Sequence, residues 1–117
     1  MATQKIRPGE EHRLTMTSAG VSDWIKLKRD VNPFEASLFI YVSDGATGVS
    51  ATVEYTPVED PESAPLSAVN NHPSVRLQSV SEYGDSNLEF PATAVRMRLD
   101  SITTGEVYFS VVQPGTR

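Results

Sequence analysis

Strict alternation of apolar and polar residues near the C-terminal end is the feature that most constrains the fold. Over residues 95–99, valine, methionine and leucine alternate with arginine, and residues 107–111 repeat the same period of two. This period gives a β-strand one apolar face and one polar face. The intervening residues 101–105 end in a glycine, which can adopt the positive φ of a tight turn. The sequence therefore predicts two strands within residues 92–113 that form a terminal hairpin.

Short runs of β-forming residues recur through the rest of the chain, separated by glycine, proline, asparagine or aspartate. Turn signals at intervals of about 8 to 12 residues are typical of a β-sandwich or barrel. No segment has a sustained apolar period of 3.6 residues, which a helix would need. We expect an all-β fold, an antiparallel β-sandwich or jelly-roll-like barrel of about seven or eight strands. The remaining predicted strands lie at residues 12–17, 23–28, 34–43, 49–56, 74–80 and 87–90, and residues 81–86 are expected to form a turn centred on Gly84.

Two central segments carry more specific signals. Residues 38–42 are continuously apolar or aromatic, which is typical of a central strand buried on both faces. The glycine-rich turn at residues 44–48 then leads to an alternating segment, so residues 38–56 are expected to form a hairpin. Residues 57–73 contain four of the eight prolines, which cannot donate to a sheet. We expect a long loop there, of the kind that carries function or lies across a partner.

The length of 117 residues is enough for one domain with a single core. Residues 1–11 are polar and include a Pro-Gly pair, which predicts a flexible N-terminal arm, free or docked on a partner. Residues 12–117 then form a single β-sandwich domain. The absence of cysteine excludes disulfides and thiolate sites and fits folding in a reducing cytoplasm. No apolar run has the length of a signal peptide or membrane span, so no membrane partner is expected.

The net charge and the absence of known motifs disfavour several classes of function. The net charge of −5 disfavours nucleic-acid binding, which needs a basic surface. The two histidines are far apart in sequence, and the acidic residues at 59–62 lack the spacing of a calcium loop. No G-x-S-x-G, Walker or G-x-G-x-x-G sequence occurs. We therefore expect no catalytic residues, no metal and no cofactor. An enzyme with a polar cleft around His72 is the alternative from a different class.

Two candidate interface residues have environments that the sequence leaves open. Trp24 lies on the opposite strand face from its aliphatic neighbours. It is either a partly buried structural residue or an anchor for a partner, since tryptophan is enriched in binding hot spots. His72 lies between an asparagine and a proline in the long loop, where it is either an ordinary loop residue or part of an interface.

The other two candidate interface residues are Arg96 and Arg98, on the polar face of the first C-terminal strand. They can pair across the sheet with Glu54 or Glu106, because opposite charges on neighbouring strands attract. Alternatively, they meet an acidic surface of another subunit, where arginine is a favoured interface residue.

Four short motifs in the second half carry a resemblance to a known class of protein. They are VEYT at residues 53–56, the Pro-rich loop ending in NHP at 71–73, FPATAVRMRL at 90–99, and the strand at 107–113 ending in VVQ. In this order they resemble small virion proteins of tailed bacteriophages. There, a VEYT or VEYS strand precedes a loop, and a P-A-x-x-V-R strand leads through a glycine turn into a strand ending V-x-Q.

The resemblance implies a structural role with no catalytic residues. Proteins of this kind are head decoration or cement proteins that bind the capsid, or small tail or adaptor components. It implies the major capsid protein or another virion protein as partner, a homo-oligomer, and a place in the virion after synthesis in the host cytoplasm. The alternative is a carbohydrate-binding β-sandwich module. Its aromatic platform would come from Trp24, Tyr41, Tyr55, Tyr83 and Tyr108.

Overall fold

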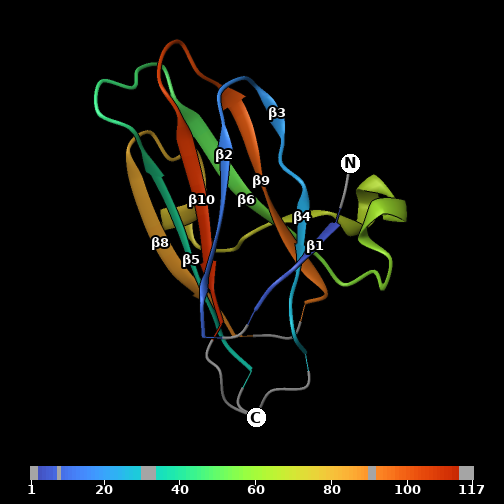
Figure 1. Cartoon of the computed structure of the whole chain (residues 1–117). Coiled ribbons are helices and arrows are strands. Elements are labelled where there is room, and N and C mark those ends of the chain that lie inside the picture. The colour runs from blue at the N-terminus through green and yellow to red at the C-terminus, as the bar shows by residue number, and fades with distance from the viewer. Residues whose placement is uncertain (1–2, 8, 30–33, 90–91, 114–117) are drawn as a thin grey trace.

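The protein is a β-sandwich, which confirms the predicted all-β class (Figure 1). The structure, a computed structural model, describes residues 3–7, 9–29, 34–89 and 92–113. The strands are β1 (Thr3–Lys5), β2 (Glu11–Met16), β3 (Gly20–Val21), β4 (Trp24–Lys26), β5 (Ala36–Val42), β6 (Ser50–Thr56), β7 (Asn70–Asn71), β8 (Tyr83–Leu88), β9 (Ala94–Ser101) and β10 (Val107–Val112). Three short 3-10 helices are η1 (Pro61–Ser63), η2 (Leu66–Ala68) and η3 (Val75–Leu77).

The described strands form two sheets. Sheet A has the strand order β1-β4-β9-β6-β7. Strand β3 precedes β4 in the chain and pairs with the same edge of β9, at residues 98–99, while β4 pairs with residues 94–95. Sheet B has the order β2-β10-β5-β8. The paired strands are antiparallel except β1 and β4, which run parallel.

The predicted terminal hairpin is wrong, because β9 belongs to sheet A and β10 belongs to sheet B. The chain between them crosses from one sheet to the other and forms an arch. The predicted hairpin at residues 38–56 is wrong in the same way, since β5 lies in sheet B and β6 in sheet A. Alternation fixes which face of a strand is buried. A hairpin and an arch both bury that face, so the pattern could not distinguish them.

The two arches are joined to each other at one end of the sandwich. Thr47 donates its backbone N–H to the carbonyl of Thr104 at 3.0 Å and accepts from the N–H of Thr103 at 2.8 Å. The hydroxyls of Thr47 and Thr104 also lie 2.8 Å apart. Gly48 has a φ of +71°, and a Cβ there would lie 2.2 Å from Thr103 Oγ1. Glycine is therefore required for both backbone conformation and the close approach of the arches.

Three further local predictions are corrected. Residues 74–80, predicted as a strand, contain η3, and most of the predicted turn at 81–86 belongs to β8. Gly84 does not form a turn; a Cβ there would lie 2.1 Å from the backbone oxygen of Arg76. The glycine thus allows η3 to pack on β8. Strand β5 is central as predicted, but its residues alternate between buried and half-buried, so only one face is in the core.

The N-terminal segment expected to be a flexible arm is folded onto the domain where it is described. Residues 3–5 form β1 beside β4, and Ile6 is in the core at 8% exposure. Gln4 donates to Asp23 at 3.0 Å and its Oε1 lies 2.7 Å from His12 Nε2. These contacts close the side of the sandwich where β1 and β2 are the edge strands.

The core lies between the sheets and is made by the alternating inward residues. Each large buried aliphatic or aromatic side chain contributes about 1.5–3 kcal/mol to folding. Sheet A supplies Ile25, Val53, Val95, Met97 and Leu99, and sheet B supplies Leu38, Ile40, Leu88, Val107, Phe109 and Val111.

The glutamine of the VVQ motif links the chain beyond β10 to the chain beyond β4. Gln113 is fully buried, and its amide donates to the carbonyl of Lys28 at 2.5 Å and accepts from the Lys28 N–H at 2.9 Å. These two hydrogen bonds pair the side chain with one backbone position, as a neighbouring strand would. The motif therefore has a structural use in this chain.

The contact between the arches predicts different costs for two glycine substitutions. Gly45→Ala and Gly48→Ala both place alanine at a positive φ, which costs about 1 kcal/mol. Only the second meets Thr103, and such overpacking costs about 1–3 kcal/mol more. We expect Gly48→Ala to lower the free energy of unfolding in urea clearly more than Gly45→Ala. Equal losses would show that the arch contact does not contribute.

Candidate functional site

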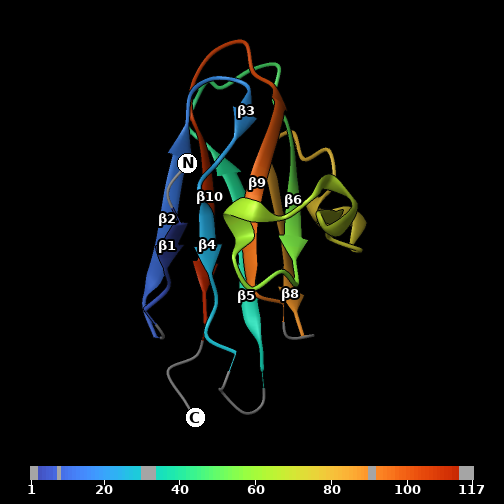
Figure 2. The same ribbon diagram turned by 90° about the vertical axis from the view of Figure 1, so that its right-hand side faces the viewer.

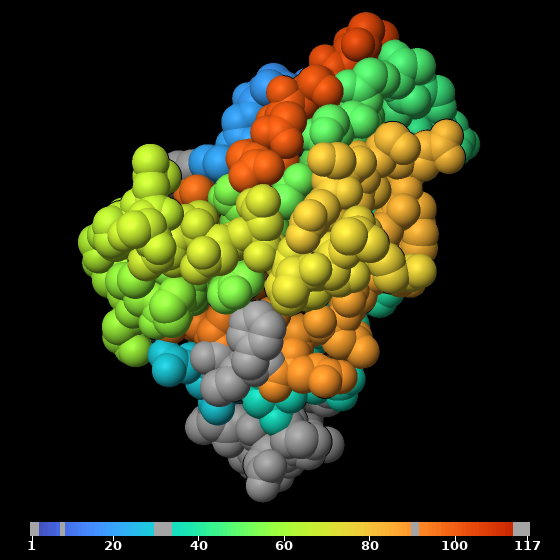
Figure 3. All heavy atoms as spheres, turned by 180° about the vertical axis from the view of Figure 1, so that it is seen from behind, coloured from blue at the N-terminus to red at the C-terminus, as the bar shows by residue number. Residues whose placement is uncertain are grey.

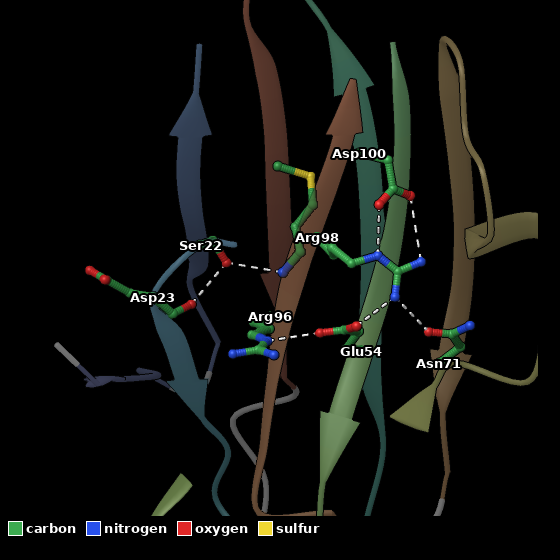
Figure 4. A network of polar contacts seen from close by, with 8 residues as sticks. Ser22, Asp23, Glu54, Asn71, Arg96, Arg98 and Asp100 are labelled. Carbon is green, nitrogen blue, oxygen red and sulfur yellow. Dashed lines mark hydrogen bonds and ion pairs between the residues drawn. The ribbon is translucent and has the colours of Figure 1, made fainter. Parts of the chain in front are cut away.

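The outer face of sheet A carries a buried ion network centred on Glu54 of β6. The side chain of Glu54 is 8% exposed and accepts from Arg96 Nε at 2.8 Å and from Arg98 Nη1 at 2.6 Å (Figure 4). Register explains this geometry, because Glu54 lies directly opposite Arg96 in the pairing of β6 and β9. The predicted cross-strand pairing of the two arginines with Glu54 is confirmed, and Glu106 is not their partner.

Arg98 makes the outer half of this network. Its Nη1 also donates to Asn71 Oδ1 at 3.1 Å, and its Nε donates to Asp100 at 2.9 Å. The hydrogen bond with Asp100, followed by that with Glu54, raises the pKa of Arg98. Two arginines and two carboxylates leave the network without net charge. It is therefore satisfied within the chain and offers no unpaired charge to an acidic partner.

Trp24 lies beside the same network and is only 3% exposed. The guanidinium carbon of Arg96 lies 4.4 Å from the centroid of its ring, which is a cation–π contact. Strands β3 and β4 are separated at Ser22, whose hydroxyl accepts from the N–H of Met97 at 3.0 Å (Figure 4). This bond replaces one backbone ladder bond and keeps the edge paired with β9 on both sides of the break.

The segment of residues 57–80 crosses the outer face of sheet A and covers much of it (Figures 2 and 3). It is hydrogen-bonded to the sheet near its start, its middle and its end. Thr93 Oγ1 donates to Pro57 O at 2.9 Å. The N–H of His72 donates to Val53 O at 2.8 Å, and the N–H of Val80 donates to Ala51 O at 2.7 Å. The predicted long loop thus lies across its own domain.

His72 connects this covering segment to sheet B. His72 is 2% exposed, with Nε2 3.0 Å from Asn87 O and Nδ1 3.0 Å from Ser74 N. A carbonyl can only accept and an amide N–H can only donate, so Nε2 carries the proton and Nδ1 carries none. Burial lowers the pKa of His72, although the bond to Asn87 acts in the opposite direction. The structure therefore holds a neutral imidazole at the edge between the two sheets.

The structure brings Trp24, Arg96 and Arg98 together, and places His72 apart from them, within the covering segment and bonded to Asn87 of β8. Trp24 and His72 are buried, and both arginines are paired within the chain. A contact of these four residues with a partner stays a prediction. For Trp24 and His72 it would require the covering side chains to move.

The outer face of sheet B was not singled out by the sequence, yet it is the more open of the two. Its outward positions on β5, β8 and β10 carry aromatic side chains that are half-buried or exposed. The rings of Tyr41 and Tyr108 lie 5.1 Å apart. The aromatic residues of this face are Phe39, Tyr41, Tyr83 and Tyr108. Three of the five predicted platform residues are therefore here, while Trp24 is buried and Tyr55 packs against the core.

Polar groups from β2 and β10 fix this aromatic face. The carboxylate of Glu11 accepts from Ser110 Oγ at 2.6 Å and from Tyr41 Oη at 3.2 Å. The hydrogen bond with Ser110, followed by that with Tyr41, lowers the pKa of Glu11. The guanidinium carbon of Arg13 lies 5.2 Å from the centroid of the Tyr108 ring. The side chains are thus held in place before any partner binds.

Two other kinds of site are absent from the described part of the chain. No group of three or more histidine, aspartate or glutamate side chains is placed to hold a metal ion there. Among the same residues, no helix has the length and apolar character needed to cross a membrane.

No protein-family model matches the sequence, and no curated protein matches it. Among solved structures, the chain is similar to a Bacillus endospore appendage pilus protein (15% identity, TM-score 0.44, 91% of this chain and 87% of that one). It is also similar to the copper-binding CorA of Methylomicrobium album BG8 (10% identity, TM-score 0.49, 97% of this chain and 98% of that one). A third similar structure is the SPBc2 prophage-derived protein YomS (12% identity, TM-score 0.43, 92% of this chain and 98% of that one). We draw no functional conclusion from similarities at this level.

The buried position of Glu54 makes its charge important for stability. In Glu54→Gln the two arginines lose their carboxylate while the shape of the side chain is kept. We expect the free energy of unfolding to fall by about 2 kcal/mol, because the largely buried guanidinium of Arg96 is left without a counter-charge, while Arg98 keeps its pair with Asp100. The matched control is Glu59→Gln, which removes a carboxylate that is 82% exposed from its pair with Arg29 and should change little. Equal effects in a urea titration would contradict a special role for Glu54.

The neutral imidazole of His72 predicts a pH dependence. Because its pKa in the folded chain is below the ordinary 6.5, the unfolded chain binds the proton first. The stabilisation that the neutral His72 contributes is complete above the ordinary pKa of 6.5 and is lost as the pH falls toward the folded pKa. Between these two values, the free energy of unfolding falls by up to about 1.4 kcal/mol per pH unit. His72→Gln, which does not titrate, should lack this part of the slope. Parallel curves of unfolding free energy against pH for the two proteins would contradict the assignment.

Proposed function

We propose that this chain is a structural protein of a bacteriophage virion, and specifically a head decoration protein that binds and stabilises the capsid as a homo-oligomer. The observation that supports this best is the outer face of sheet B, which is half-open, aromatic and charged. The motif resemblance in the second half of the sequence supplies the phage context.

The chemistry of this face suits binding to another protein. Tyrosine and arginine are among the residues most enriched at the centres of protein interfaces. On this face Tyr41, Tyr108 and Arg13 contact one another, and Glu11 holds Tyr41 by a hydrogen bond. Side chains already fixed in the free protein lose little conformational entropy on binding. The face can therefore contribute affinity without first rearranging.

A decoration role also fits a modest surface on a small domain. A capsid presents the same surface many times, so contacts that are individually weak can add up when subunits bind next to one another. The partner in this proposal is the major capsid protein, and a neighbouring copy of the chain is the second contact.

The proposal is tested on particles of the phage that carries this gene, by electron microscopy with gold-labelled antibodies against the purified protein. Label distributed over the head supports a decoration protein. Label confined to the tail replaces it with a tail or adaptor component, and particles without label overturn the virion proposal.

A binding assay then tests the face itself. Purified protein is added to particles and the bound amount is measured after sedimentation. We expect Arg13→Glu to reduce binding, because Arg13 lies on the outer face of sheet B. Lys5→Glu makes the same change of charge on β1 of sheet A and should bind as the unchanged protein does. Equal binding by both variants would exclude this face as the docking surface.

A further inference from the structure

A hollow of about 360 Å³ lies on the outer face of sheet B, between β5 and β8. Its size is at the lower end of the range for small-molecule sites. Phe39, on the outward face of β5, is the aromatic residue in its lining. The other lining residues are Ser37, Arg76, Asp85, Ser86 and Asn87. It is separate from the Tyr108 and Arg13 cluster used in the proposed function.

Strand register builds this hollow from residues far apart in sequence. Phe39 lies directly opposite Asp85, and Ser37 lies directly opposite Asn87. Arg76 reaches the same place from η3, where its Nε donates to the backbone oxygen of Asp85 at 2.9 Å and its Nη2 is bonded to the carboxylate. One aromatic ring is thus bordered by a ring of polar groups held by the sheet.

The charges in the hollow cancel. Arg76 and Asp85 form an ion pair, and Asp85 Oδ2 also accepts from Tyr83 Oη at 2.9 Å. The hydrogen bonds with Arg76 and then Tyr83 lower the pKa of Asp85, so it stays ionised and paired. A site without net charge gives no advantage to an anion or a cation, and it favours a neutral ligand.

Two donors remain for such a ligand. Ser37 Oγ donates to Asn87 Oδ1 at 3.3 Å, which leaves the amide nitrogen of Asn87 without an acceptor among the described residues. Arg76 Nη1 likewise has no acceptor among them. These N–H groups border the ring of Phe39. A ligand that satisfies them needs hydroxyl or carbonyl oxygens at its edge and an apolar face for the ring.

We propose that this hollow binds a neutral pyranose sugar of a glycan. A pyranose has C–H groups on one face, which pack on an aromatic ring, and hydroxyl groups around its edge, which accept from Asn87 and Arg76. The solvent-exposed Tyr83, 58% exposed and paired opposite Tyr41, extends the aromatic surface for a second sugar unit. This binding activity does not depend on the virion proposal.

The test is a glycan array of neutral and charged glycans, followed by NMR titration of the full chain with the best neutral glycan. We expect binding to neutral glycans. Phe39→Leu keeps an apolar side chain but removes the ring face, and should weaken binding about tenfold. Asn87→Asp removes the donor at nearly the same shape and should weaken it by about the same factor.

Tyr108→Leu is the control, since it removes a ring from the same face of sheet B outside the hollow. Its affinity should stay within about twofold of the unchanged protein. Failure to bind neutral glycans overturns the proposal, as does undiminished binding by a folded Phe39→Leu variant. Equal loss in Tyr108→Leu would also overturn it, because the site would then be the wider aromatic face. Antibody labelling of particles is independent of all three results.

Discussion

The junction of the two arches is the constraint on which the rest of the structure depends. Because β5 and β9 each continue into the opposite sheet, one pair of connections determines which strands are neighbours in both layers. The hydrogen bonds between Thr47 and residues 103–104 hold these connections together. Once they are joined, β6 lies beside β9 and β5 beside β10, and the apolar faces of all four strands meet in the core.

The two outer faces of the sandwich then have different uses. On sheet A the charges of Glu54, Arg96 and Arg98 are paired beneath a covering segment, so this face mainly stabilises the domain. On sheet B the outward aromatic side chains are at least partly accessible. Burying an ion pair is costly unless hydrogen bonds complete it, and the network around Glu54 meets that condition. The division leaves the outer face of sheet B as the more accessible of the two faces.

Much of the architecture was predictable because alternation directly reports which side chains face the core. It predicted an all-β sandwich and a cross-strand pairing of Arg96 with Glu54 or Glu106, and the continuous apolar run at residues 38–42 predicted the central position of β5. Alternation does not report strand neighbours, so arches were taken for hairpins. The hollow at Phe39 could not be predicted for the same reason. Its lining residues come from β5, β8 and η3, and only the strand register shows that they lie together. Gly84 was expected to be a turn residue, because the neighbouring sequence does not show that the backbone of Arg76 packs closely against it.

The position of β10 has a consequence for how the protein is made. It is the last of the described strands in the chain, yet it is an inner strand of sheet B, with β2 on one side and β5 on the other. Until it emerges from the ribosome, β2 and β5 have no common neighbour, and each leaves a polar backbone edge open. Contacts between strands so distant in sequence form slowly, because the intervening chain must first be ordered. Sheet B therefore assembles only after β10 has been synthesised, and this strand then completes its pairings with β2 and β5 together.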